Sequence, residues 1–115
     1  MTDEQKKYIQ DLVEDCYANS MVHGWYDDVS EVNIPEKICL MHSELSEALE
    51  DYRNGNMEEQ TSPEGKPIGF PSELADVIIR IFDFCGHQKI DIAGAIERKM
   101  QHNATRPYKH GGKVC

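Results

Sequence analysis

The segment "HSELSEALEDY" (residues 42–52) and the later segment "SELADVIIRIF" (residues 72–82) spell nearly the same phrase. Each contains a glutamate and a leucine, then a small residue and a second acid. Apolar residues recur in both at three- and four-residue spacing, which predicts amphipathic helices. The apolar stripe around the first segment consists of Ile38, Met41, Leu45, Ala48, Leu49 and Tyr52. Two helices with such stripes are expected to pack together, and this pair decides the fold.

The rest of the chain is also helical by its pattern. The expected helices span residues 3–23, 34–53, 72–86 and 91–103. Gly24 ends the first, Ser72 caps the third and Asp91 caps the fourth. Residues 54–71 are rich in glycine and proline and predict a long loop, and residues 104–115 form a basic tail. We therefore expect an all-α, four-helix bundle-like fold with four helices around one core.

Composition restricts the class of protein. With 115 residues and 39% apolar residues, one domain over residues 1–115 is expected. No apolar run approaches the roughly 20 residues of a membrane span, and the N-terminal segment lacks the apolar stretch of a signal peptide. The four cysteines lie far apart without a Cys-x-x-Cys pair, which favours reduced thiols. The sequence thus predicts a cytoplasmic protein without a membrane partner.

The net charge of −9 conceals a segregation of charge. Residues 98–115 carry five bases and no acid, whereas residues 1–97 hold all 21 acids and the other seven bases. The surplus of acids on the body argues against broad binding to a nucleic-acid backbone. We expect no nucleic-acid partner.

The acids of the repeated phrase hold matched positions on their helices. At about 100° per residue, Glu44 borders the apolar stripe and Glu47 lies about 60° further round. Glu73 and Asp76 repeat this geometry on the next helix. If the two stripes pack together, the four acids line one groove at the edge of the core.

Four converging carboxylates repel one another unless a cation compensates their charge. Ligation by carboxylates alone favours hard cations, and Mg²⁺, with Mn²⁺ as a substitute, is the expected metal. Di-iron helical bundles use a Glu-x-x-His step, which this chain lacks. The alternative is that these acids are only the solvated edges of two amphipathic helices.

Taken in order, the motifs resemble a known family. Glu44-x-x-Glu47 is followed by Glu73-x-x-Asp76, then by Lys99-x-x-x-Asn103-x-x-Arg106 and a closing "HGGK". This order, from about residue 23 to residue 113, resembles the MazG-like branch of the all-α nucleoside triphosphate pyrophosphatases. The resemblance implies Mg²⁺-dependent hydrolysis of a nucleoside or deoxynucleoside triphosphate to the monophosphate and pyrophosphate, as nucleotide-pool house-cleaning. It also implies a homo-oligomer, a dimer or a tetramer.

The resemblance implies roles for individual residues. Glu44, Glu47, Glu73 and Asp76 would hold the metal, and Glu47 or Glu44 would take a proton from the attacking water. Lys99, Asn103 and Arg106, on one face of the fourth helix, would bind the substrate's phosphates. Many members of the family have a second glutamate where this chain has Ser43, which leaves the number of metals per site open.

Three further residues are candidates on chemical grounds. The Trp25 ring and the His42 side chain are candidates for contact with the nucleobase, although aromatic residues near helix ends are more often packing anchors. Arg80, one turn after Asp76, is expected to project toward the same groove and to assist a phosphate or a carboxylate that lies behind the metal ligands.

Other functions remain open on the sequence. A dUTP or phosphoribosyl-ATP hydrolase of the same superfamily would use the same four acids. A non-catalytic helical module could instead bind a protein or nucleic-acid partner through its acidic groove and basic tail. The third helix is apolar almost all round, which independently favours a homo-oligomer.

Overall fold

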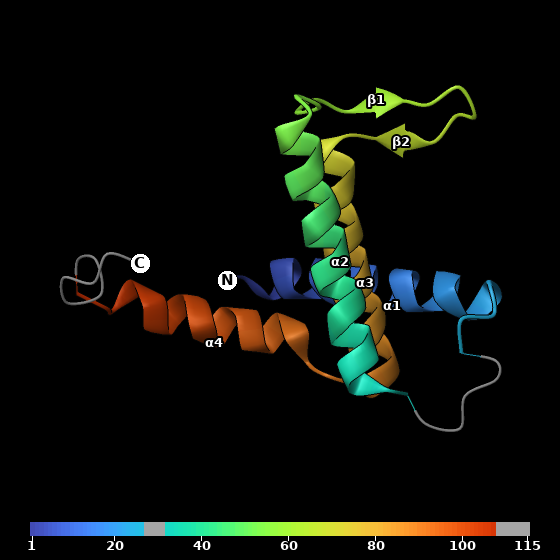
Figure 1. Cartoon of the computed structure of the whole chain (residues 1–115). Helices are drawn as coiled ribbons and strands as arrows, with labels where there is room; N and C mark the ends of the chain where they lie inside the picture. Colours follow the sequence, from blue (N-terminus) through green and yellow to red (C-terminus); the bar gives the residue numbers. More distant parts are fainter. Residues whose placement is uncertain (27–31, 108–115) are drawn as a thin grey trace.

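A computed structural model describes residues 1–26 and 32–107 of the chain. Its elements are α1 (Asp3–Val22), α2 (Ile34–Arg53), β1 (Gln60–Thr61), β2 (Pro67–Ile68), α3 (Phe70–Gln88) and α4 (Ile92–Ala104). Helices thus dominate the described part, which has almost no strand, and the prediction of an all-α fold is confirmed (Figure 1). None of the described helices combines the length and the apolar character needed to cross a membrane.

Capping side chains fix the starts of three helices. Thr2 and Gln5 form a capping box at the start of α1, and the Asn33 side chain accepts a hydrogen bond from the Glu36 amide at the start of α2. The Asp91 carboxylate accepts from the Gly94 amide at 3.0 Å and begins α4. The expected cap of the fourth helix is therefore confirmed.

The bounds of α3 differ from those expected. The helix begins at Phe70, so Ser72 lies inside its first turn and donates its hydroxyl to Glu59 Oε1 at 3.3 Å instead of capping the helix. At the other end the helix continues past Gly86 and stops after Gln88, where Lys89 adopts a left-handed conformation with φ 57°. Gly86 is needed for packing rather than termination, because a Cβ at this position would lie 2.6 Å from the Tyr17 Cβ on α1.

The predicted long loop contains a short antiparallel hairpin. Gln60 pairs with Ile68 and Thr61 with Pro67. Gly69, at φ 108°, returns the chain into α3, and a side chain there would collide with the Glu58 carbonyl oxygen. The hairpin therefore projects from the end of the α2–α3 pair (Figure 1).

Helix α3 packs against both α2 and α1, whereas α4 makes a smaller contact with α1. Figure 1 shows α2 and α3 side by side and antiparallel, α1 crossing them, and α4 projecting to one side. The largest fully buried side chain of the described part is that of Val13, on α1. The expectation of four helices enclosing one core is thus not met within a single chain.

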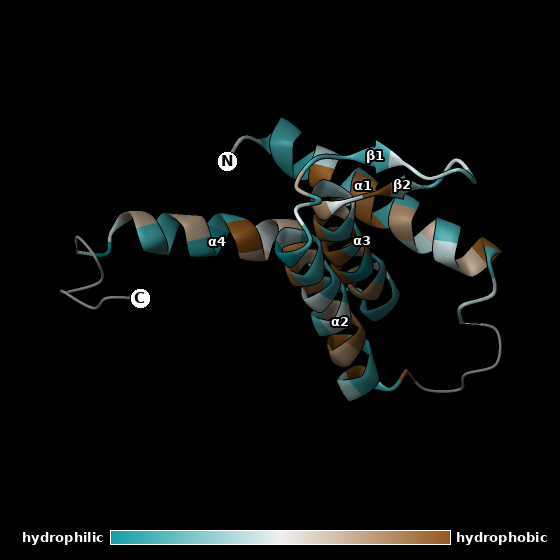
Figure 2. Ribbon diagram, turned by 45° about the horizontal axis from the view of Figure 1, so that its top comes forward, coloured by the Kyte–Doolittle hydropathy of each residue, from teal (hydrophilic) through white to brown (hydrophobic). Residues whose placement is uncertain are grey.

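The apolar stripe of α2 is only half buried. Ala48 is 3% exposed, but Leu45 and Leu49 are each 47% exposed. Figure 2 shows hydrophobic positions along α3 and on the neighbouring helices. The buried residues of α2 are Ala48 and Glu44, and Glu44 is 7% exposed. The face of α2 that contacts α3 therefore lies closer to the acids than the predicted apolar stripe does.

Candidate metal centre and ligand cavity

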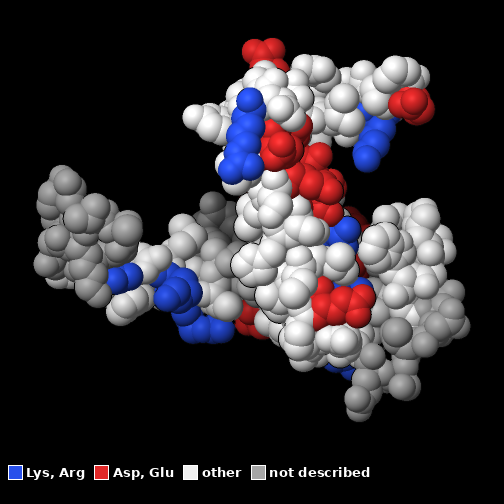
Figure 3. Space-filling model, viewed as in Figure 1, with Lys and Arg blue, Asp and Glu red and all other residues white. Residues whose placement is uncertain are grey.

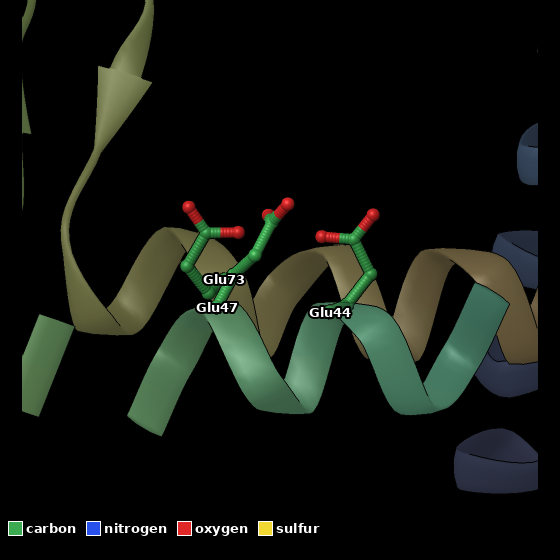
Figure 4. A group of neighbouring side chains, drawn as sticks. All are labelled: Glu44, Glu47 and Glu73. Atoms are coloured by element: carbon green, nitrogen blue, oxygen red, sulfur yellow. The ribbon is translucent and has the colours of Figure 1, made fainter. Parts of the chain in front are cut away.

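Glu44 and Glu47 of α2 converge with Glu73 of α3. One carboxylate oxygen of each lies within 4.8 Å of the other two, and all three side chains point to the same side of the helix pair (Figure 4). A three-residue step on α2 stacks its two acids one turn apart, and the antiparallel pairing brings Glu73 opposite them. The convergence expected from the repeated phrase is therefore present for these three residues.

Glu73 is in an electrostatically unfavourable position. Burial, the hydrogen bond and charge of Glu47, and the charges of Asp76 and Glu44 together raise the pKa of its carboxyl from 4.5 to about 7. Its Oε2 is buried and has no hydrogen-bond partner within residues 1–26 and 32–107. Such a group requires a proton or a cation near neutral pH.

Asp76 and Arg80 extend the group along α3. Burial raises the pKa of Asp76, and the nearby charge of Glu44 raises it further, while Arg80 and Lys66 act in the opposite direction. The Arg80 Nε donates to Glu44 Oε1 at 2.8 Å, so one cation already neutralises one acid. Asp76 shares the cavity but lies outside the group of three oxygens within 4.8 Å.

These side chains line a cavity of about 410 Å³. Its lining residues are Asn19, Ser20, Trp25, Glu44, Glu47, Lys66, Glu73, Asp76, Ile79, Arg80 and Asp83. Figure 3 shows acidic residues along the α2–α3 pair beneath the hairpin, at the margin of a hollow. The cavity therefore combines hard carboxylate ligands, two cations and one indole ring.

Trp25 lines the cavity, and with the adjacent Tyr26 it forms an aromatic wall. The Arg80 Cζ lies 5.5 Å from the ring centroid of Trp25, and the Lys37 Nζ lies 4.9 Å from that of Tyr26. Tyr26 is buried and donates its hydroxyl to Asp83 Oδ1 at 3.0 Å. Burial and the adjacent Asp83 raise the pKa of this phenol.

The Tyr26 ring is also held from one side by a histidine. It stacks on His87, with centroids 4.3 Å apart and planes 12° from parallel. These contacts fix the backbone next to Trp25, a residue that is 52% exposed and whose ring has the Arg80 and Lys37 side chains over it. Trp25 thus lines the cavity beside the buried Tyr26, and its contact with a base stays a prediction.

Four predicted site residues lie outside this cavity. His42 is exposed on α2 and does not line the cavity. Lys99, Asn103 and Arg106 are exposed on or just after α4, which projects away from the acids (Figure 3). Within a single chain these three residues do not line the cavity with the acids, because sequence periodicity gives the phase of a helix but not its direction. Their role in phosphate binding stays a prediction. The "HGGK" segment lies outside the described residues.

The structure adds four residues that sequence reasoning missed. Asn19 and Ser20 reach the cavity from α1, Lys66 from the hairpin and Asp83 from α3. Asp83 follows Asp76 by two helical turns and was detectable as a charged residue in an apolar helix. Asn19, Ser20 and Lys66 carry no such signal.

The donor set fits Mg²⁺ or Mn²⁺. Both prefer carboxylate oxygens, which Glu44, Glu47, Glu73 and Asp76 supply, and the buried Glu73 Oε2 has no hydrogen-bond partner in the described part of the chain. A further cavity of about 340 Å³, between α1 and the α3–α4 turn, has no such group of carboxylates among its described lining residues. The larger cavity is therefore the candidate site.

In comparisons with known proteins, no protein-family model, no curated protein and no solved structure matches the chain.

Proposed function

We propose that the protein is a Mg²⁺-dependent nucleoside triphosphate pyrophosphohydrolase of the MazG-like, all-α type, which converts a (d)NTP to the monophosphate and pyrophosphate. One observation carries the proposal. Three glutamates from two helices converge within 4.8 Å, and one of them has a buried oxygen without a partner in the described part of the chain. Such a group accommodates a divalent cation, and the cavity around it offers cations and an aromatic ring for a phosphorylated ligand.

The four acids would bind the metal. Glu44, Glu47 and Glu73 supply the converging oxygens, and Asp76 supplies a further carboxylate in the same cavity. When bound, Mg²⁺ would neutralise these carboxylates and polarise the α-phosphate toward attack by water. Its presence would also remove the repulsion that raises the pKa of Glu73.

Glu47 is the better of the two candidate general bases. Glu44 is 7% exposed and accepts a hydrogen bond from Arg80, so one of its oxygens is occupied. Glu47 is exposed and lines the cavity next to the Glu73 carboxyl. An oxygen of Glu47 that does not hold the metal would accept the proton of the attacking water.

The substrate would span the cavity from end to end. Its phosphates would lie near the acids, and its base would lie on the Trp25 ring, with the Asn19 amide and the Ser20 hydroxyl at the same end. An amide offers both a donor and an acceptor to the edge of a base. The residues of this end are therefore the candidates for base selection.

The experiment is an incubation with each dNTP and MgCl₂, followed by separation of the products. The proposal expects monophosphate and pyrophosphate in equal amounts. Turnover confined to dUTP or to phosphoribosyl-ATP would select the related hydrolases. Release of orthophosphate and diphosphate would refute cleavage at the α-phosphate, and binding without any turnover in Mg²⁺ or Mn²⁺ would favour a non-catalytic module.

We also propose that the protein is a homo-oligomer. The chain exposes 8654 Å² and has a radius of gyration of 16.8 Å, against about 6,400 Å² and about 13 Å expected for a compact chain of its size. Apolar side chains that are 38–62% exposed follow α2 and the adjoining part of α3: Ile34, Ile38, Leu45, Leu49, Tyr52, Leu74 and Ile78. A second copy of the chain is the simplest partner that would bury this apolar face.

Light scattering after size-exclusion chromatography tests the assembly. The proposal expects a mass of two or four chains, and Leu49→Lys should lower it. A wild-type mass of one chain at micromolar concentration would refute the homo-oligomer. Arg53→Gln, at the exposed end of the same helix, is the control.

A further inference from the structure

Arg80 joins the two ends of the cavity. Its Nε donates to Glu44 Oε1 at 2.8 Å, and its Cζ lies 5.5 Å from the ring centroid of Trp25. The side chain is 26% exposed, so it is partly enclosed and held in place. The guanidinium therefore lies between the metal-binding acids and the aromatic wall.

Most of the hydrogen-bonding capacity of Arg80 is unused. Within residues 1–26 and 32–107, only Nε makes a hydrogen bond, so both terminal amino groups retain their donors. A guanidinium presents these donors as a planar fork that matches the oxygens of a phosphate. Of the two cations that line the cavity, Lys66 is exposed on the hairpin, and Arg80 alone contacts the acids and the ring.

The order of groups in a nucleotide matches this arrangement. In a nucleoside triphosphate, the α-phosphate lies between the nucleoside and the two terminal phosphates. With the base on Trp25 and the terminal phosphates toward Glu47 and Glu73, the α-phosphate falls beside Arg80. We propose that Arg80 binds the α-phosphate, the group attacked in the reaction, an inference that rests on the proposed function.

The contact with Glu44 couples this role to the metal. In the described structure Arg80 neutralises Glu44, and part of its charge is engaged there. A divalent cation on Glu44 takes over that neutralisation, so the charge of the guanidinium becomes available to an anion. The metal is therefore expected to bind before the nucleotide, and Arg80 is not expected to strengthen metal binding.

The experiment measures ligand binding by Arg80→Gln. The probes are Mn²⁺ alone, pyrophosphate with Mg²⁺, and a (d)NMP with Mg²⁺, all measured by titration calorimetry. The variant should bind Mn²⁺ and pyrophosphate as the wild type does, or more tightly, and should bind the monophosphate about 10- to 100-fold more weakly. Equal losses for pyrophosphate and the monophosphate, or no loss for either, would overturn the proposal.

Two further variants complete the design. Arg80→Lys keeps the charge beside Glu44 but lacks the fork, so it should retain wild-type thermal stability and still lose monophosphate affinity; full affinity would contradict the proposal. It also remains informative if Arg80→Gln does not fold. Arg53→Gln removes another arginine paired with a glutamate, outside the cavity, and should leave all three affinities unchanged.

The proposed function and this inference fail in different ways. If the wild type binds Mn²⁺ but neither turns over nor binds any nucleotide, the proposed function is refuted and the role of Arg80 with it. If the wild type releases pyrophosphate and Arg80→Gln retains wild-type KM, kcat and monophosphate affinity, only the role of Arg80 is refuted.

Discussion

Without metal, replacement of Glu73 by glutamine is expected to stabilise the protein. With metal, the variant is expected to be less stable than the wild type. Glu73 has a pKa of about 7 in the folded chain, against an ordinary value of 4.5. Because the folded state holds this proton more tightly than the unfolded state, the free energy of unfolding falls as pH rises from about 4.5 to about 7. Above about pH 7 the wild type is destabilised in full by the charge of the Glu73 carboxylate.

The magnitude follows from the shift in pKa. At about 1.4 kcal/mol per pKa unit, the shift corresponds to an upper bound of about 3 kcal/mol. Solvent screens a partly exposed carboxylate, so about 1 kcal/mol is expected, which corresponds to roughly 3–6 °C in Tm for a chain of this size. Glu73→Gln removes the negative charge and with it this penalty.

The assay is thermal unfolding in EDTA and in millimolar MgCl₂ at about pH 5 and about pH 8. In EDTA the Tm of the variant should exceed that of the wild type at about pH 8 and equal it at about pH 5. With MgCl₂ at about 100 times the Kd of the metal, the free energy of unfolding of the wild type should rise by about 2–3 kcal/mol. That of the variant should hardly change. Glu50→Gln, one turn after Glu47 and 62% exposed, is the control and should show neither effect.

Either of two results would refute this reasoning. A variant that is less stable than the wild type in EDTA at the higher pH would show that the carboxylate is not repelled in the folded state. A variant that keeps the full stabilisation by Mg²⁺ would show that Glu73 is not a ligand.

Three further substitutions test the packing and the cavity. Gly86→Ala should lower the free energy of unfolding by about 1–3 kcal/mol in a denaturant titration, because its Cβ would lie 2.6 Å from the Tyr17 Cβ; an unchanged midpoint would contradict the close approach. Tyr26→Phe should cost about 1–2 kcal/mol by leaving Asp83 without its donor, and equal stability would argue against the buried hydrogen bond. Trp25→Ala should raise the KM for dNTP at least about tenfold with little change in unfolding; an unaltered KM would exclude base stacking.

The helices could be predicted from sequence because their signals are local. Capping at Asp91 and the periodicity of residues 34–53 depend on neighbours along the chain, and both agree with the structure. The start of α3 at Phe70 was missed because Gly69 ends the loop by its backbone conformation and not by a capping side chain. Gly86 was misread as a helix end because its function, close contact with Tyr17, is tertiary.

The candidate site, too, could be predicted from sequence only in part. The convergence of Glu44, Glu47 and Glu73 was predictable because residue spacing fixes the phase of each acid, although the contact face of α2 lies closer to the acids than its apolar stripe indicated. Asp76 was predicted in the same group and lies in the same cavity. The course of α4 was not predictable, because nothing local to Lys99 specifies how a short turn directs the following helix.

The central claim is that the carboxylates of α2 and α3 hold a divalent cation. A crystal structure of the protein grown with MnCl₂, with anomalous data collected at the manganese edge, tests it most directly. The account predicts an anomalous peak between the two helices, with carboxylate oxygens of Glu44, Glu47 and Glu73 at about 2.0–2.3 Å from it. Ordered carboxylates without a peak between them at saturating Mn²⁺ would contradict the account.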